Sequence, residues 1–272
     1  MTIKVAVAQL ELTTSSPRQN LERAEAAIRE AASNGAQLIV LPELTNSGYA
    51  FTDIDQARAN CWEIDGPEIQ SWIDLARELS IVLVAGVGIN NESTLLNCSI
   101  IIDSSGVRGL YEKAHLWGNE PDFFARGNTP PLVVDTSIGR IATMVCYDAE
   151  FPEWVRIAML NGAQVLALPT NWPDTGLPVK PTPMEVVRVQ AAASQNKMVV
   201  AAADRTGEEN GVTWVSASTI VDYNGTIQAG VTSRGQEIIY ADVELPTDDS
   251  IGPRNAIKAD RRVDLYGKFT KS

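Results

Sequence analysis

Apolar residues recur along the chain in two patterns, one typical of buried strands and the other of amphipathic helices. Residues 3–9 (IKVAVAQ) alternate and are rich in β-branched side chains, which predicts a strand. Residues 37–42 (QLIVLP) form a continuous apolar run, as in a strand buried on both faces. Between them, residues 17–33 place apolar side chains on one stripe at helical spacing, namely Leu21, Ala24, Ala27, Ile28 and Ala31.

The helix between these strands has start and stop signals. Ser16 fits an N-cap and Pro17 the first helical position, and Gln19, three residues after the cap, predicts a capping box. The pair Asn34-Gly35 predicts the end of the helix, because glycine readily adopts the left-handed conformation found there.

The alternation of strand and helix continues along the chain. Helices are predicted at Pro67–Leu79, 152–161 and 183–195. Strands are predicted at 81–88, 96–102, 139–146, 164–169, 198–203, 216–222 and 237–244. The polar and basic tail after Pro246 is assigned no regular element. This order of elements predicts an α/β fold.

One nine-residue segment occurs twice. Residues 34–42 read NGAQLIVLP and residues 161–169 read NGAQVLALP, with six identical positions. Each copy lies where a predicted helix gives way to a strand. Two such turns can resemble each other by chance, but the length of the match favours a duplicated βαβ framework. No low-complexity linker divides the chain, so residues 1–272 are predicted to form one domain with internal pseudo-symmetry.

Composition narrows the classes of function. The net charge of −12 and the pI of about 4.6 argue against nucleic acid or an acidic membrane as a partner. The N-terminus lacks the pattern of a secretory signal, and no apolar stretch reaches the roughly 18–20 residues that span a bilayer. Three cysteines without regular spacing make disulfides unexpected, so a cytoplasmic location is predicted.

Histidine is nearly absent. His115 is the single histidine, so the chain cannot supply the His and Cys ligands of a zinc site at a recognisable spacing. No metal or cofactor is predicted. A Ser–His–Asp or Cys–His hydrolase would have to use His115. A hydrolase with this composition is therefore expected to move protons through another side chain.

Cys146 is a candidate nucleophile. It ends a predicted strand and enters a turn before the helix that starts near Pro152. Backbone N–H groups at such a turn can hold an oxyanion, and they are expected to help lower the pKa of the thiol. The alternative is a buried structural cysteine, which is the interpretation given to Cys61 and Cys98.

Two charged residues lie at comparable positions. Glu43 directly follows the buried run LIVLP, and a buried glutamate with a raised pKa is a competent general base. Lys113 follows the segment RGLYE, and a buried lysine can stabilise a developing oxyanion. Alone, Glu43 fits a capping role and Lys113 a surface role. Together with Cys146 they supply nucleophile, base and electrophile without imidazole.

Three separated motifs resemble those of the nitrilase, or carbon–nitrogen hydrolase, superfamily. They are LPE at 41–43, Y-E-K-x-H-L at 111–116 and V-C-Y-D-x-x-F-P-E at 145–153, and P-T-N-W at 169–172 also fits. The resemblance implies a four-layer α-β-β-α sandwich with pseudo-twofold symmetry, and a homodimer or larger assembly. It covers nearly the whole chain.

The resemblance also implies roles for individual residues. Glu43 would act as general base, and Cys146 would attack the substrate carbon to form a thioester. Lys113 and the backbone N–H of Tyr147 would stabilise the oxyanion. Glu120 fits a second glutamate that helps to place substrate or water, although an exposed loop carboxylate is the alternative reading.

The predicted substrate pocket rests on residues near these motifs. Tyr49, Trp117, Tyr147 and Trp172 could form an aromatic wall, and Asn171 lies beside the last of them, although plain core positions are the alternative. Relatives that hydrolyse N-carbamoyl amino acids commonly carry Arg where this chain has Glu150. An acidic side chain there is expected to repel a substrate carboxylate, unless Arg188 or another residue builds a carboxylate site.

The resulting prediction is a hydrolase of non-peptide carbon–nitrogen bonds that converts a small aliphatic amide to a carboxylic acid and ammonia. Nitrile hydrolysis and N-carbamoyl amide hydrolysis with the same triad are the alternatives. From other classes, a catalytically silent binding protein and a cysteine peptidase using His115 with Cys146 are also considered. His115 is instead predicted to support the site.

Overall fold

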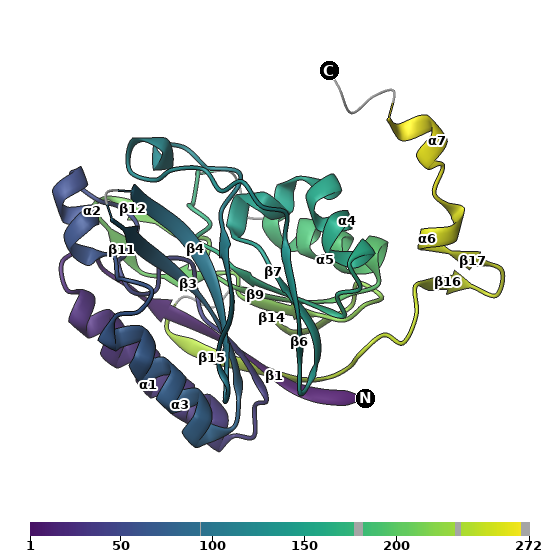
Figure 1. Cartoon of the computed structure of the whole chain (residues 1–272), viewed down its shortest axis with the longest axis horizontal. Coiled ribbons are helices and arrows are strands. Elements are labelled where there is room, and N and C mark those ends of the chain that lie inside the picture. The colour runs from purple at the N-terminus through teal and green to yellow at the C-terminus, as the bar shows by residue number, and fades with distance from the viewer. Residues whose placement is uncertain (93, 177–181, 232–234, 268–272) are drawn as a thin grey trace.

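The computed structural model describes residues 1–92, 94–176, 182–231 and 235–267, and two sheets form its body (Figure 1). In the first sheet the strand order is β10-β1-β2-β3-β4-β5, and β15 also pairs with β1. The strands are β1 (Thr2–Glu11), β2 (Leu38–Val40), β3 (Val82–Asn91), β4 (Thr94–Asp103), β5 (Gly106–Glu112), β10 (Arg205–Thr206) and β15 (Glu237–Glu244).

The second sheet has the order β14-β13-β9-β8-β7-β6. Its strands are β6 (Leu132–Thr136), β7 (Gly139–Thr143), β8 (Val165–Pro169), β9 (Val199–Ala203), β13 (Thr219–Val221) and β14 (Ile227–Gly230). Each sheet has a parallel centre, β1-β2-β3 in the first and β7-β8-β9 in the second, with antiparallel strands on both sides. The two halves of the chain therefore repeat one topology.

Helices cover the outer face of each sheet. Helices α1 (Pro17–Ser33) and α3 (Pro67–Leu79) pack on the first sheet, and α4 (Pro152–Leu160) and α5 (Met184–Asn196) pack on the second (Figure 1). The inner faces of the two sheets meet in a third apolar cluster of Val, Ile, Ala and Leu side chains. The elements therefore stack in the order α-β-β-α, and the mixed α/β fold predicted from the sequence is confirmed.

The repeated segment forms the same hydrogen bonds in both halves. Gly35 and Gly162 have φ angles of 84° and 86°, which only glycine adopts readily. The side-chain Oε1 of Gln37 accepts the N–H of Lys4, and that of Gln164 accepts the N–H of Arg140. The equivalent turns and bonds account for the glycine and the glutamine that both copies share.

Some predicted boundaries differ from those observed. The strand predicted at 139–146 ends at Thr143, because Cys146 takes a left-handed φ of 46° and begins the 3₁₀ helix η2 (Cys146–Glu150). Ser16 is the N-cap of α1, but its side chain makes no capping hydrogen bond, so the predicted capping box is wrong. The strand predicted at 216–222 is reduced to β13.

Several short elements had no sequence prediction. They are α2 (Ile54–Asn60), β5, the 3₁₀ helix η1 (Glu120–Asp122), β6, β10, β11 (Glu208–Glu209), β12 (Val212–Thr213) and β14. The strands among them are short or half-exposed edges, which lack a long apolar run. Among the described residues, no helix combines the length and apolar character needed to cross a bilayer.

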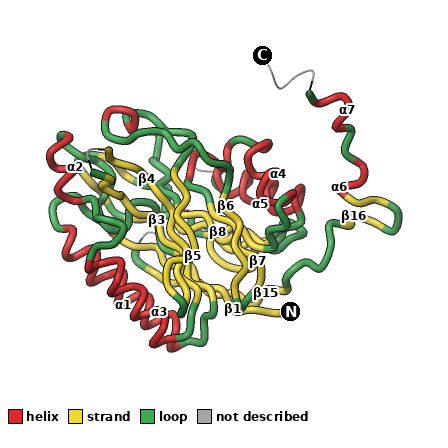
Figure 2. The backbone as a smooth tube through the Cα atoms, viewed as in Figure 1, coloured by secondary structure: helices red, strands yellow, loops and turns green. Residues whose placement is uncertain are grey.

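The C-terminal segment leaves the body and extends away from both sheets (Figures 1 and 2). It contains β16 (Ser250–Gly252), β17 (Asn255–Ala256), α6 (Ile257–Asp260) and α7 (Val263–Tyr266), to which the sequence assigned no element. Several of its apolar side chains, including Ile251 and Val263, are exposed.

Candidate active site

The predicted catalytic residues follow strands of both sheets. Glu43 lies just after β2, and Lys113 directly follows β5 in the first sheet. Cys146 comes after β7 in the second sheet, and Asn171 comes after β8. Because the sheets pack face to face, these strand ends bring the side chains together. Glu43, Lys113 and Cys146 are all buried.

A buried lysine joins two buried carboxylates. Lys113 Nζ donates to Glu43 Oε1 and to Glu120 Oε1, each at 2.7 Å. The side chains of Glu43 and Lys113 have no exposed surface, and that of Glu120 is 2% exposed. The reading of Glu120 as an exposed loop carboxylate is therefore wrong, since its side chain reaches the lysine from η1.

The protonation states of this cluster follow from burial and charge. Burial raises the pKa of Glu43, while the adjacent ammonium of Lys113 opposes the rise. Burial alone would lower the pKa of Lys113, but the carboxylates of Glu120 and Glu43 outweigh it, and the pKa is raised. The lysine therefore stays charged, whereas Glu43 binds a proton more readily than an ordinary glutamate.

One oxygen of Glu43 has no hydrogen-bond partner. Glu43 Oε1 accepts from Lys113 and also from Asn97 Nδ2 at 2.7 Å. Glu43 Oε2 is buried and finds no donor among the described residues. A buried carboxylate oxygen is normally hydrogen-bonded, so this oxygen is available to a reacting group.

Cys146 lies on a tight turn at the start of η2. The turn gives it a φ of 46°, and its Sγ lies 3.7 Å from the backbone oxygen of Asn171. Tyr147 is the second residue of η2, and the first N–H groups of a helix lack partners inside it. The Tyr147 N–H is thus suited to hold an oxyanion, as the resemblance implied.

The resting thiol of Cys146 is not activated. Burial raises its pKa well above the usual range and the carboxylate of Glu43 raises it further, while Lys113 lowers it. Burial and Glu43 therefore outweigh the groups that lower this pKa, and the thiol stays protonated in the resting protein. The thiol needs a base to remove its proton, and Glu43 is the neighbouring carboxylate.

His115 is engaged elsewhere. Its Nδ1 lies 2.7 Å from Asp148 Oδ1, and its backbone N–H donates to the same oxygen at 3.0 Å. The imidazole stacks on Phe151 with ring centroids 3.9 Å apart. Asp148 also accepts from Tyr111 and from the N–H of Val145. This carboxylate ties the segment after Lys113 to the cysteine turn, which fits the predicted supporting role of His115 and leaves the peptidase reading without geometric support.

A cavity of about 330 Å³ opens onto Cys146. Four predicted pocket residues line it, namely Trp117, Tyr147, Glu150 and Trp172, and the rings of Trp117 and Tyr147 meet edge to face with centroids 5.0 Å apart. Glu150 pairs with Arg188 at 2.8 Å. The argument that Glu150 repels a substrate carboxylate is therefore weakened, because a guanidinium balances its charge.

The other two predicted pocket residues contact the catalytic cluster instead. The hydroxyl of Tyr49 donates to Glu120 Oε1 at 2.7 Å, and Asn171 Nδ2 donates to the backbone oxygen of Glu43 at 3.0 Å. Their predicted substrate contacts stay predictions.

Sequence reasoning assigned no role to two residues that shape the site. Asn97 lies on β4 and faces Glu43, but nothing in its local sequence distinguishes it from a core position. Asp204 accepts the N–H of Trp172 at 3.0 Å, and burial raises its pKa to about 7, although three backbone donors oppose the rise. Its position just after β9, at the end of another buried apolar run, was an available signal.

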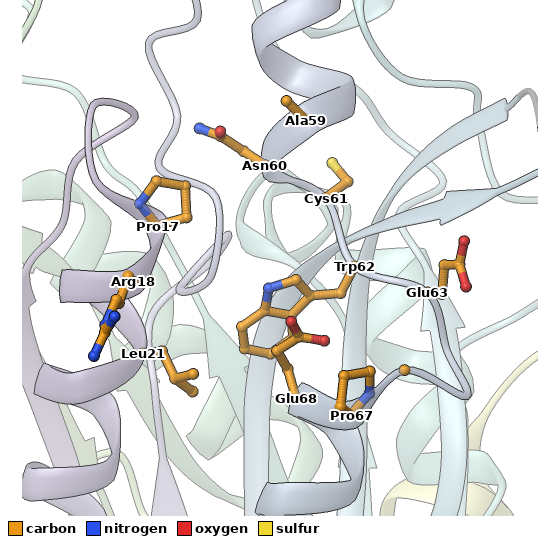
Figure 3. A pocket seen from close by; sticks show the side chains of 11 residues that line it. Pro17, Arg18, Leu21, Ala59, Asn60, Cys61, Trp62, Glu63, Pro67 and Glu68 are labelled. Carbon is orange, nitrogen blue, oxygen red and sulfur yellow. The ribbon is translucent and has the colours of Figure 1, made fainter.

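A second cavity, of about 570 Å³, lies between α1, the end of α2 and the start of α3 (Figure 3). Cys61 and Trp62 line it, with Arg18, Glu63 and Glu68 among its polar side chains. Burial raises the pKa of Cys61 to about 12, so its thiol is a poor nucleophile. This agrees with the structural reading of Cys61.

Comparison with known proteins identifies the family to which the chain belongs. The carbon–nitrogen hydrolase family model matches residues 4–250. A nitrilase of Pyrococcus abyssi is 32% identical over 97% of this chain and 99% of its own length. A 2-oxoglutaramate amidase of Bacillus subtilis is 29% identical over 96% of this chain and 98% of its own.

A solved structure agrees with these relatives. An amidase variant from Nesterenkonia sp. AN1, with the acetamide moiety of fluoroacetamide added at its active-site cysteine, is 25% identical with a TM-score of 0.79. The match covers 98% of this chain and 96% of that one. The chain belongs to the carbon–nitrogen hydrolase family, and it is a hydrolase of the nitrilase superfamily.

Proposed function

We propose that the protein hydrolyses a small aliphatic amide to a carboxylic acid and ammonia through a thioester on Cys146. The observation that carries the proposal is the unpartnered Oε2 of Glu43, buried in a cluster with Lys113 and close enough to raise the pKa of the Cys146 thiol. This is an arrangement of base, cation and nucleophile that works without imidazole.

In the first half of the reaction, Glu43 Oε2 takes the proton from Cys146 Sγ as the sulfur attacks the amide carbon. The carbonyl oxygen becomes an oxyanion, which accepts from Lys113 Nζ and the N–H of Tyr147. Two hydrogen bonds already fix Lys113 Nζ, so its remaining N–H points away from both carboxylates. Protonated Glu43 then gives its proton to the leaving nitrogen, the carbon–nitrogen bond breaks, and ammonia departs.

In the second half, water replaces ammonia in the site. Glu43 removes a proton from water as the oxygen attacks the thioester carbon, and the same oxyanion donors stabilise the second tetrahedral intermediate. The carbon–sulfur bond then breaks, the acid is released, and the thiolate recovers its proton from Glu43. Glu120 holds Lys113 in position throughout.

The choice of an amide draws on the cavity and on the comparisons. A cavity of about 330 Å³ suits a small substrate. The amidase of Nesterenkonia sp. AN1 and the 2-oxoglutaramate amidase of Bacillus subtilis support an amide, since both are named for amide hydrolysis. The nitrilase of Pyrococcus abyssi favours a nitrile as the second candidate.

The test is ammonia release from acetamide, propionamide and butanamide beside propionitrile and N-carbamoyl compounds, with the Cys146→Ala variant as the blank. The wild-type protein is expected to release ammonia from amides faster than the Cys146→Ala variant does. If it does so from nitriles alone, the second candidate replaces the first, and if it does so from no amide or nitrile the proposal is wrong.

The pH dependence of kcat/KM should report the raised pKa of Glu43. The carboxylate must be unprotonated to accept the thiol proton, so activity falls as the pH drops through this pKa. Because burial raises it, the acid limb should lie above the value of about 4.3 for an ordinary glutamate. Steady-state assays from pH 4 to 9, with circular dichroism at each pH as the control for unfolding, measure it. An acid limb at or below the ordinary value contradicts this assignment.

Assembly and location belong to the same proposal. The free thiols of Cys61, Cys98 and Cys146 suit a reducing cytoplasm. Exposed Met184 and Val187 on α5, near the cavity, suit a homodimer that packs helices beside the active site. Sedimentation velocity would test the assembly, and a monomer at micromolar concentration would contradict it.

A further inference from the structure

A charged pair forms part of the wall of the catalytic cavity. Glu150 ends the 3₁₀ helix that Cys146 begins, and Arg188 lies on α5. Arg188 Nη1 and Glu150 Oε1 are 2.8 Å apart, and the two side chains are 41% and 23% exposed. Both charges therefore border the space where a substrate attached to Cys146 lies.

Fold stability does not explain an ion pair at this position. A partly exposed pair contributes little to the free energy of unfolding. Burial also raises the pKa of Glu150, with Arg188 opposing the rise, which means that the wall is unfavourable for this carboxylate. A ligand that uses both charges accounts for the pair.

The contact leaves both groups with capacity for a ligand. It joins one guanidinium nitrogen to one carboxylate oxygen, whereas a guanidinium has five N–H donors and a carboxylate about four acceptor sites. A ligand with only a negative charge that binds Arg188 leaves Glu150 without its partner, and Glu185 also lines the cavity. A ligand with only a positive charge meets Arg188. A group that carries both charges satisfies both partners.

We propose that Glu150 and Arg188 recognise the zwitterionic head group of an α-amino acid, with Arg188 binding its carboxylate and Glu150 its ammonium group. This inference rests on the proposed amidase function, because the side chain of that amino acid ends in the amide that Cys146 attacks. The aromatic side chains of Trp117, Tyr147 and Trp172 line the cavity beside Cys146 and suit the methylene groups between the two ends.

A matched series of amides tests the head group. Glutamine carries both charges, glutaramate only the carboxylate, 4-aminobutanamide only the ammonium group, and butanamide neither. Charged hydrogen bonds of this kind change affinity by roughly 10- to 100-fold each. The kcat/KM for glutamine should therefore exceed that of each singly charged amide by at least about tenfold.

Variants assign each charge to its residue. Arg188→Gln should lower the ratio of kcat/KM for glutamine to that for 4-aminobutanamide, which differ in the carboxylate. Glu150→Gln should lower the ratio for glutamine to that for glutaramate, which differ in the ammonium group. Glu153→Gln is the matched control, because Glu153 is exposed on the neighbouring helix α4 and should leave every ratio unchanged.

Norvaline separates this proposal from the amidase function, because it has the head group but no amide. It should bind the wild-type protein in a calorimetric titration, and both variants should weaken that binding. If butanamide is hydrolysed but glutamine is not preferred and norvaline does not bind, the head-group proposal is wrong and the amidase function stands. If norvaline binds but no amide yields ammonia, the amidase function fails and the head-group site stands.

Discussion

The variant Cys146→Ala is expected to lose amide hydrolysis by at least about 10⁴-fold in kcat, since removing a covalent nucleophile typically has an effect of this size or larger. The fold should persist, because alanine keeps the Cβ that already occupies the turn with φ of 46°. The measurement is steady-state ammonia release, with thermal unfolding of both proteins to compare their stability.

The control for this variant is Cys61→Ala. Cys61 borders the second cavity, and its pKa of about 12 makes it unreactive, so its replacement should leave kcat unchanged. Intact-mass spectrometry of the wild-type protein during turnover should find the acyl group on the peptide that contains Cys146. Turnover that survives in Cys146→Ala, or an acyl group on another peptide, would contradict the thioester mechanism.

The sequence predicted those parts of the fold that rest on local patterns. Continuous apolar runs such as 37–42 predicted strands buried on both faces, because only a covered strand can lack polar positions. The repeated N-G-A-Q segment predicted the duplicated topology, since Gly35 and Gly162 occupy the same left-handed turn. Glu43 was a candidate because it follows the apolar run 37–42, and both Glu43 and Lys113 lie in motifs that resemble those of the carbon–nitrogen hydrolase superfamily.

The remaining features depend on contacts between distant segments. Asn97 pairs with Glu43 from a strand whose sequence reads as core. The ion pair between Glu150 and Arg188 joins η2 to α5, which lies far along the chain. The sequence around Glu150 does not show this partner, so Glu150 was predicted to repel a substrate carboxylate. The raised pKa of the Cys146 thiol depends on burial and on the carboxylate of Glu43. The sequence next to Cys146 shows neither of these, because both depend on the packing of the two sheets.

Replacing Lys113 with Met is expected to reduce both activity and stability. Activity falls because the oxyanion loses its charged donor, an effect of about 10²- to 10³-fold in kcat. Stability falls because Glu43 and Glu120 are left as buried carboxylates without their cation. Breaking a buried ion pair in this way typically lowers the free energy of unfolding by about 3–5 kcal/mol. Lys4→Met, a change outside the buried cluster, is the matched control.

The pH dependence of this loss identifies its cause. Without Lys113, its ammonium no longer opposes the effect of burial on Glu43, whose pKa should lie further above that of the unfolded chain, so the folded state binds more protons. The free energy of unfolding then falls as the pH rises through this window, and it recovers as the pH is lowered. Thermal unfolding from pH 8 to 5 should therefore show the deficit of Lys113→Met shrinking toward acid. Adding Glu120→Gln should restore part of the stability at pH 7, because it removes one buried charge. A deficit that is independent of pH and unaffected by Glu120→Gln would point to lost packing instead of uncompensated charge.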